Sequence, residues 1–201
     1  MSRLEVELRH ALASDLDAIL ALERATPHAP HWPPSAYSAI VDIDTAGADR
    51  SRCTGPYSAP QRCLIVAQTA AQTMAQTAIQ AAAERDGAVA GFAVGLIQPA
   101  PASVNSVDPL HVPPCAGCVG ELESIVVAAS ARRAGIGSAL CGVVLDWCRR
   151  QGATEVMLEV RSASAAAIAL YAGLGFAQAG RRPGYYRDPE DDALILRVQW
   201  D

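Results

Sequence analysis

The spacing of apolar residues changes along the chain, and these changes predict where its helices and strands lie. Residues 6–24 begin as a strand and continue as an amphipathic helix, with Asp15 next to the predicted start of that helix. A second short helix is expected from Ser35, and two apolar runs of strand type cover residues 63–67 and 88–97. The first half of the chain therefore predicts two helices and three strands.

In the second half of the chain, strand-type and helix-type spacings of apolar residues alternate more clearly. Strand patterns cover residues 122–127, 154–161 and 193–198, and helical patterns cover residues 137–150 and 165–172. Strand, helix, strand, helix and strand in this order favour an α/β fold, in which helices cover a sheet.

Three polar or proline-containing segments interrupt the pattern. They lie at about residues 42–61, 68–86 and 98–119. A chain of 201 residues, of which 51% are apolar, is long enough to bury one sizeable core. We therefore expect a single domain over residues 1–201 that carries these three segments as insertions.

Charge and hydropathy narrow the possible environments of the protein. The chain has 16 basic and 21 acidic residues, so its overall charge indicates neither nucleic-acid binding nor attachment to an anionic membrane. It contains no run of about 20 apolar residues, and its first residues lack the apolar stretch of a signal peptide. We expect a soluble, cytoplasmic protein. Any anion-binding site must depend on a few neighbouring residues and not on the overall charge.

Six cysteines are present without a secretory signal, so we expect reduced thiols. Cys141 and Cys148 are seven residues apart on a predicted helix, which places both on one face, where they are expected to pack in the core. Cys115 and Cys118 form a two-residue knuckle that two further cysteines could in principle complete as a zinc site. Because no second knuckle exists, we expect no metal.

Residues 130–138, Ser-Ala-Arg-Arg-Ala-Gly-Ile-Gly-Ser, join a predicted strand to a predicted helix. At such a junction, free backbone N–H groups and the helix dipole favour a phosphate group. Gly135 and Gly137 let a ligand approach the backbone, while Arg132 and Arg133 add positive charge. An ordinary strand-to-helix turn with solvated arginines has the same composition, so the segment alone leaves both interpretations open.

Arg132-x-x-Gly135-x-Gly137 after the strand at residues 121–127 resembles the coenzyme A signature of the GNAT acetyltransferases. The loop lacks the ending of a Walker phosphate loop, and Leu140 stands where a dinucleotide-binding pattern needs glycine. The resemblance implies an α/β GNAT fold, with a mixed central sheet splayed around acetyl-CoA and helices on both of its faces.

The same resemblance implies how acetyl-CoA, the expected co-substrate, is held. The backbone groups of the preceding strand would bind the pantetheine amides, and those of the loop, which begins at Arg132, would cradle the pyrophosphate. The strand residues are Ile125, Val126 and Val127, and the cradle residues are Arg133, Ala134, Gly135, Ile136, Gly137 and Ser138.

Strand alternation separates the side chains of residues 154–161 into two sets. Val156, Leu158 and Val160 share one face, so Glu159 lies on the other. A glutamate there can accept a proton from an attacking amine, directly or through one water. The alternative from the residues alone is a surface ion pair between Glu159 and Arg161.

Residues 158–176 and 181–186 are similar to the RimI-type ribosomal-protein alanine N-acetyltransferases. This resemblance implies that Glu159 is the general base and that Tyr171 protonates the departing coenzyme A thiolate, whereas without it Tyr171 would be interpreted as a core residue. Ser164 stands where these enzymes usually carry asparagine. We expect Ser164 to cap the following helix and to contribute to the cofactor site.

Glu121 and Glu123 are rival candidates for the base, because many GNAT enzymes use a carboxylate on the preceding strand. The resemblance as a whole implies acetyl transfer to the N-terminal α-amine of a protein, with the alanine of a small-subunit ribosomal protein as the expected acceptor. Two alternatives stay open: a small amine or lysine side chain as the acceptor, and a catalytically idle coenzyme A-binding module that senses acyl-CoA or docks a partner.

Overall fold

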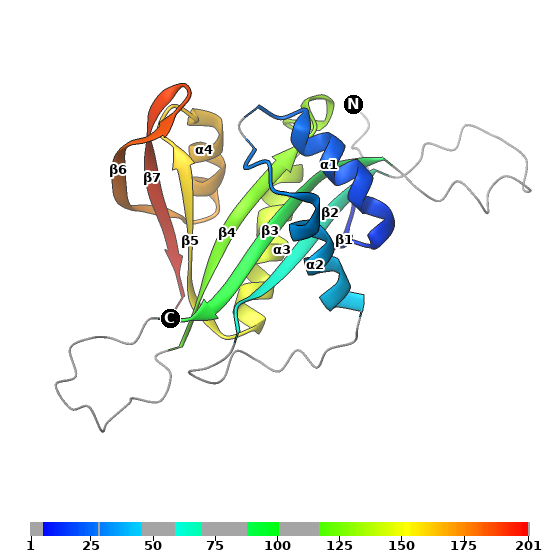
Figure 1. The fold of residues 1–201 in the computed structure, drawn as a ribbon. Helices are drawn as coiled ribbons and strands as arrows, with labels where there is room; N and C mark the ends of the chain where they lie inside the picture. Colours follow the sequence, from blue (N-terminus) through cyan, green and yellow to red (C-terminus); the bar gives the residue numbers. More distant parts are fainter. Residues whose placement is uncertain (1–5, 28, 46–58, 70–87, 101–116, 201) are drawn as a thin grey trace, which may run out of the picture. The chain divides into compact units, whose positions relative to one another are not determined.

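The computed structural model describes residues 6–27, 29–45, 59–69, 88–100 and 117–200. Except for their ends, the three expected insertions lie outside these described residues. The described strands are β1 (Val6–His10), β2 (Gln61–Thr69), β3 (Val89–Pro99), β4 (Cys118–Val127), β5 (Ala153–Arg161), β6 (Ala177–Arg187) and β7 (Glu190–Gln199) (Figure 1). The helices are α1 (Leu16–Arg24), α2 (Pro34–Thr45), α3 (Ile136–Arg150) and α4 (Ala165–Gly173), with short 3₁₀ helices η1 (Ala13–Asp15) and η2 (Ala129–Ala131).

The strands form one mixed sheet in the order β1-β2-β3-β4-β5-β7-β6. β4 and β5 are parallel, whereas β1 with β2, β5 with β7, and β6 with β7 are antiparallel. The α/β class expected from the alternation of strand and helix patterns is confirmed. Among the described helices, none is long and apolar enough to cross a membrane.

The chain divides into two compact units, and β2, β3, β4 and α3 each contribute residues to both. Unit 1 comprises Met1–Ala48, Leu64–Ala93 and Ser124–Val143; unit 2 comprises Asp49–Cys63, Val94–Glu123 and Val144–Asp201. The expectation of one domain over the whole chain stays a prediction.

In unit 1, helices lie against both faces of β3. The Phe92 ring meets the Tyr37 ring of α2 edge-on, with centroids 5.9 Å apart. A Cβ placed on the adjacent Gly91 would lie 3.2 Å from Cδ1 of Leu140 on α3. Because successive strand residues point to opposite faces, α2 and α3 cover opposite faces of β3. The expectation of helices on both faces is confirmed for this unit.

A buried glutamate fixes the connection between α1 and α2. Glu23 is only 2% exposed, and its Oε1 accepts a hydrogen bond from Tyr37 Oη at 2.6 Å and from the Trp32 backbone N at 3.1 Å. Burial and the neighbouring carboxylate both raise the pKa of Tyr37, so the phenol keeps its proton and donates a hydrogen bond to Glu23. These bonds satisfy a charge that would otherwise be costly to bury.

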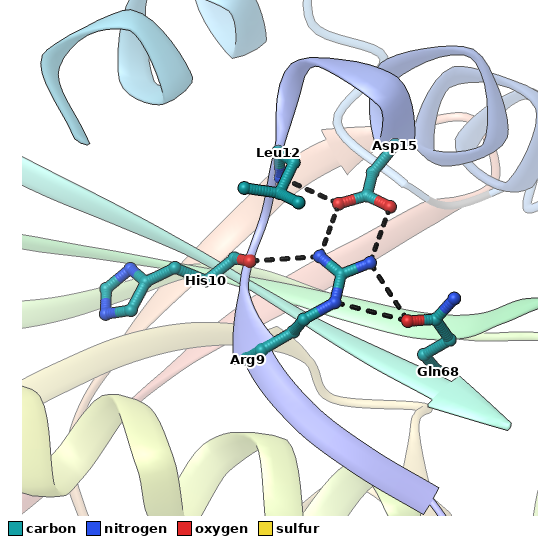
Figure 2. A network of polar contacts seen from close by, with 5 residues as sticks. All are labelled: Arg9, His10, Leu12, Asp15 and Gln68. Carbon is teal, nitrogen blue, oxygen red and sulfur yellow. Dashed lines mark hydrogen bonds and ion pairs between the residues drawn. The ribbon is translucent and has the colours of Figure 1, made fainter. Parts of the chain in front are cut away.

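A second polar network in unit 1 joins β1, η1 and β2 (Figure 2). Arg9 donates to both carboxylate oxygens of Asp15, at 2.7 and 2.9 Å, and to Oε1 of Gln68. Asp15 Oδ2 also accepts the Leu12 backbone N–H at 2.7 Å. Burial works to raise the pKa of Asp15, but the bonds from Arg9 and Leu12 outweigh it and lower that pKa. Asp15 is therefore ionised, and its carboxylate holds the turn before α1 in place.

In unit 2, α3 packs closely on β3 and β4 because both strands present glycine to it. A Cβ on Gly95 would lie 2.6 Å from Val144 Cγ1, and one on Gly120 would lie 2.8 Å from Cys148 Sγ. Cys148 in this unit and Cys141, which belongs to unit 1, are both fully buried, which confirms that they are core residues. Burial raises the pKa of Cys141 to about 12, so its thiol stays protonated and inert.

The hydrophobic pattern did not predict β6. Nearly all of its residues are exposed, and the strand contains Gly180, Pro183 and Gly184, so it shows neither alternation nor an apolar run. It forms because its backbone pairs with β7 from Ala177 to Arg187. Tertiary pairing thus overrides a sequence with little strand signal.

Candidate active site

Two neighbouring strands of unit 2 present glutamates on the same side of the sheet. Burial alternates residue by residue along β4, and Glu121 and Glu123 lie on its less buried side. Along β5, Val156, Leu158 and Val160 are buried while Glu159 is not. The predicted orientation of Glu159, away from the apolar face of its strand, is confirmed.

The described pairing between β4 and β5 ends beside these glutamates. The last pair in the parallel register is Glu121 with Met157, and Met157 is 37% exposed. Two residues further along β5, Glu159 pairs with Ile195 of β7 on its other side. The sheet therefore offers Glu121 and Met157 side by side, with Glu159 one step beyond on the same face.

Two of the three glutamates are held by arginines that hydrophobic patterning did not single out. Arg62 Nε and Nη2 bind the two carboxylate oxygens of Glu123 at 2.7 and 2.8 Å. Arg182 Nη1 binds Glu159 Oε1 at 2.6 Å. Glu159 is thus ion-paired, but with Arg182 of β6 and not with Arg161.

Burial and neighbouring charges perturb the pKa of Glu121. Burial raises its pKa, and the negative charges of Glu123 and Glu159 raise it further. Arg62 and Arg182 act in the opposite direction but do not cancel these effects. The pKa of Glu121 is therefore raised, because burial and the nearby negative charges disfavour its ionised form.

The β6–β7 hairpin that carries Arg182 is tied to the turn after β5. Asp191 accepts hydrogen bonds from Ser162 Oγ at 2.5 Å and from the Ala163 backbone N at 3.2 Å. Arg161 donates to the backbone oxygens of Asp188 and Pro189, both at 3.0 Å, and lies over the Tyr186 ring. These bonds hold the hairpin, and with it the Arg182 guanidinium, next to Glu159.

Tyr171 lies near the end of α4 and is only 6% exposed. Its ring packs against Phe176 with centroids 5.7 Å apart, and its backbone oxygen accepts the Phe176 N–H at 3.0 Å. This packing fixes the position of the Tyr171 ring. A core residue and a proton donor both need such a fixed position, so the packing does not distinguish the two roles. Its role as a proton donor stays a prediction.

Ser164 is the N-cap of α4, but its side chain makes no capping hydrogen bond, so this part of the expectation was wrong. Its ψ of 62° lies outside the extended region in which an N-cap hydroxyl reaches the following amides. Its backbone oxygen instead accepts the N–H groups of Ala167 and Ile168, both at 3.0 Å. A contact between Ser164 and the cofactor stays a prediction.

The arginine- and glycine-containing loop lies in unit 1, between β4 and α3. Ile125, Val126 and Val127 are the last residues of β4, and Arg132 Nε returns to bind the Val127 backbone oxygen at 3.2 Å. Arg133 and Gly135 have φ angles of 65° and 83°. This backbone turns sharply, and left-handed φ angles favour glycine at position 135.

The same loop leaves its amide groups open to a ligand. Residues 132–135 and Ser138 are exposed, and the first helical bond runs from Ala139 N to Gly135 O at 3.0 Å. The N–H groups of Ile136, Gly137 and Ser138 lie in the first turn of α3, which has no acidic residue. Exposure, free donors and the helix dipole make this junction suited to a pyrophosphate. Its use as a cofactor site stays a prediction.

Within the ranges that the structure describes, no group of three or more His, Cys, Asp or Glu side chains could hold a metal ion. Cys118 is buried at the start of β4, and Cys53 and Cys115 lie outside the described residues.

Comparisons with known proteins point to one family. Residues 48–176 match the family model described as the acetyltransferase (GNAT) family. A curated relative, the [ribosomal protein bS18]-alanine N-acetyltransferase of Escherichia coli strain K12, is 42% identical over 79 residues, or 38% of this chain. The match spans about half, 53%, of that relative's length.

Solved structures share the fold. Arabidopsis thaliana NAA60 in complex with a bisubstrate analogue aligns with a TM-score of 0.69 at 18% identity, covering 98% of this chain and 100% of the other. The ribosomal-protein-S18-alanine N-acetyltransferase from Escherichia coli aligns with a TM-score of 0.58 at 22% identity, covering 97% and 94%. At these identities the likeness shows the fold alone, and it confirms the fold class expected from the sequence.

Proposed function

Because the chain belongs to the GNAT acetyltransferase family, we propose that it transfers acetyl from acetyl-CoA to the N-terminal α-amine of a protein. We propose the alanine of a small-subunit ribosomal protein as the acceptor and the cytoplasm as the location. The sequence match to an alanine N-acetyltransferase supports this acceptor. The observation that carries the proposal is the exposed Arg132–Ser138 junction, whose free amides at the start of α3 suit a pyrophosphate.

In the proposed binding mode, three amides of the first turn of α3 donate to the pyrophosphate oxygens. Arg133 adds a positive charge, and the left-handed Gly135 lets the phosphates approach the backbone. Ile125 to Val127 offer strand backbone to the pantetheine amides. Arg132, whose guanidinium binds the Val127 oxygen, holds the loop in place and contributes charge.

In the proposed reaction, the acceptor nitrogen attacks the thioester carbonyl carbon, a new C–N bond forms and the C–S bond breaks. The amine proton passes to Glu159, through its Oε2 or one water, because Oε1 is held by Arg182. Tyr171 gives its proton to the departing thiolate. All bonds and protons of the reaction are accounted for without a metal or a redox partner, so we expect that the enzyme requires no metal.

The test uses the purified protein with acetyl-CoA and three acceptors. They are a peptide that begins with alanine, the same peptide N-terminally acetylated and carrying one lysine, and a small primary amine. Thiol release and product mass are measured together. We expect turnover with the free N-terminus only, and N-terminal mass spectrometry of cells with and without the protein then identifies the natural acceptor.

Other outcomes would replace the proposal. Turnover with the lysine peptide or the small amine alone would move the acceptor to another amine class. Binding of acetyl-CoA without turnover of any acceptor would instead indicate a coenzyme A-binding module.

A further inference from the structure

Arg182 of β6 places a guanidinium against one oxygen of the proposed base. Its Nη1 lies 2.6 Å from Glu159 Oε1, which is a short distance for an ion pair. Both side chains stay partly open to solvent, with 53% and 28% of their surfaces exposed. An exposed pair of this kind contributes little to the stability of a fold. The effect of the pair is therefore local, on the orientation and the charge of Glu159.

The β6 backbone and an aromatic ring determine where this guanidinium lies. Arg182 pairs with Ala193 of β7 at the last position before the register of the two strands shifts. Its Cζ lies 5.6 Å from the centroid of the Tyr185 ring, within the range of a cation–π contact. Strand pairing and ring contact thus hold the Arg182 side chain in addition to the ion pair itself.

Two aspartates fix the β6–β7 hairpin to the segment that follows β5. The Asp191 carboxylate accepts hydrogen bonds from Ser162 Oγ at 2.5 Å and from the Ala163 backbone N at 3.2 Å. The Asp192 backbone oxygen accepts the Ser162 N–H at 2.9 Å, and its carboxylate accepts the Gly184 N–H at 2.7 Å. These bonds join the end of β5, which carries the proposed base, to the hairpin that carries the guanidinium.

The charged and titratable side chains around Glu159 come from three strands. They are Glu121 of β4, Arg161 of β5, and Arg182 and Tyr186 of β6. The register partner of Glu159 on β7, Ile195, is apolar. The guanidinium of Arg161 lies over the Tyr186 ring, 4.1 Å from its centroid. Glu121 repels the ionised form of Glu159, and the ion pair with Arg182 offsets this repulsion.

We propose that Arg182 is a positioning residue for the acetyl transfer: its ion pair with Oε1 turns Oε2 of Glu159 toward the acceptor amine and keeps the carboxylate ionised. The inference rests on the proposed function, because it concerns the base of that reaction. Arg182 acts through Glu159 and exchanges no proton itself. The amine proton passes to Glu159, as in the proposed reaction.

The first test removes the guanidinium in Arg182→Gln and uses a peptide that begins with alanine. We expect kcat to fall about 10- to 100-fold, with the KM for acetyl-CoA changed less than about twofold. Loss of the cation disfavours ionised Glu159, so the acid limb of the pH profile of kcat/KM should move to higher pH. Arg182→Lys keeps the charge but not the planar guanidinium. It should return the acid limb to its wild-type position and restore part of kcat.

Arg197→Gln is the matched control. Arg197 lies 3.6 Å from Glu155, another glutamate on the same face of β5, so this variant also breaks one partly exposed pair of arginine and glutamate. Its kcat and its pH profile should match those of the wild type. Thermal denaturation of both variants checks that they are folded to the same extent.

The second test needs no turnover. The carboxyl groups of glutamate-labelled protein are titrated by carbon-13 NMR, and the signal of Glu159 is assigned by its loss in Glu159→Gln. The midpoint of this titration should rise by about one pH unit in Arg182→Gln and stay unchanged in Arg197→Gln.

The possible failures are distinct. An unchanged midpoint in Arg182→Gln would overturn this inference, whatever acceptor the protein uses. Full kcat in Arg182→Gln, or equal losses of kcat in Arg182→Gln and Arg197→Gln, would overturn it as well and leave the proposed function intact. Absence of acetyl transfer to any amine by the wild-type protein would overturn the proposed function, and this inference with it.

Discussion

Three glutamates on one face of the sheet acquire different properties from their immediate neighbours. Arg62 neutralises Glu123 through two hydrogen bonds, and Arg182 holds one oxygen of Glu159. Glu121 keeps a raised pKa because burial and its two carboxylate neighbours disfavour its charge. At the scale of single residues, the ion pairs therefore place Glu159, the proposed proton acceptor, in a different electrostatic environment from Glu121.

Replacing Glu159 with glutamine keeps the size of the side chain but removes its ability to take a proton. We expect kcat to fall about 10²–10⁴-fold near neutral pH, with acetyl-CoA binding preserved. Activity should partly recover toward pH 9, because a larger fraction of the amine is then already deprotonated. Steady-state kinetics over this pH range are the measurement. Normal turnover of Glu159→Gln together with a dead Glu123→Gln would place the base on β4.

Tyr171→Phe removes the phenolic hydroxyl group and keeps the ring that packs on Phe176. Loss of a general acid should lower kcat about 10²–10⁴-fold with little change in affinity for acetyl-CoA. Thermal denaturation serves as the control, and the midpoint should stay close to that of the wild type. An unchanged kcat would show that Tyr171 acts only in packing.

At the scale of elements, the junction of β4 and α3 depends on backbone conformation more than on side chains. Gly135 has a φ of 83°, and a Cβ placed on it would meet no heavy atom within 4 Å. A side chain there would therefore cost backbone strain, of about 1–2 kcal/mol, and would occupy the space that the proposed binding mode gives to a phosphate.

Gly135→Val should raise the KM for acetyl-CoA by about tenfold or more, while kcat at saturation changes little. Gly142→Val is the matched control, because a Cβ at that position in α3 also meets nothing within 4 Å and Gly142 has no positive φ. Its KM should stay near the wild-type value. Equal effects of the two substitutions would show that the junction has no special role in binding.

The turn before α1 is held by a carboxylate whose pKa is lowered, so its contribution to stability depends on pH. Asp15→Asn removes the charge that binds Arg9 and should cost about 1–3 kcal/mol at pH 7. Stability linked to a lowered pKa is present above the unfolded value, near ~3.9, and is lost as pH falls through the folded value. In urea titrations, the difference between variant and wild type should therefore shrink below about pH 4. A difference independent of pH would assign the effect to packing.

At the scale of the whole molecule, binding of acetyl-CoA should add to the stability of the folded chain. A ligand present at about 100 times its Kd stabilises the native state by about 2.7 kcal/mol. If the pyrophosphate supplies much of the affinity, acetyl-CoA should raise the thermal midpoint far more than acetyl-pantetheine at the same concentration. Added salt should reduce the difference, because it screens the charges of the loop. Equal shifts for the two thioesters would contradict the assignment of the Arg132–Ser138 junction.

Features that depend on local periodicity and loop chemistry could be predicted from the sequence. The outward orientation of Glu159 follows from the two-residue period of β5, and the core positions of Cys141 and Cys148 follow from a seven-residue spacing on α3. The strand-to-helix junction could be recognised because its arginines and glycines lie within nine consecutive residues. Short-range backbone geometry determines all of these, whatever the rest of the chain does.

Features that join distant parts of the chain were decided only by the tertiary structure. Glu123 meets Arg62 across 61 residues of sequence, and Glu159 meets Arg182 of β6, a strand whose exposed residues show no hydrophobic alternation. The order and register of the strands bring these charges together, and register reflects the pairing of the whole sheet. The sequence by itself therefore determined that Glu159 faces away from the apolar side of its strand, whereas the sheet decided which guanidinium Glu123 and Glu159 each meet and left the Glu121 carboxylate without an ion pair among the described residues.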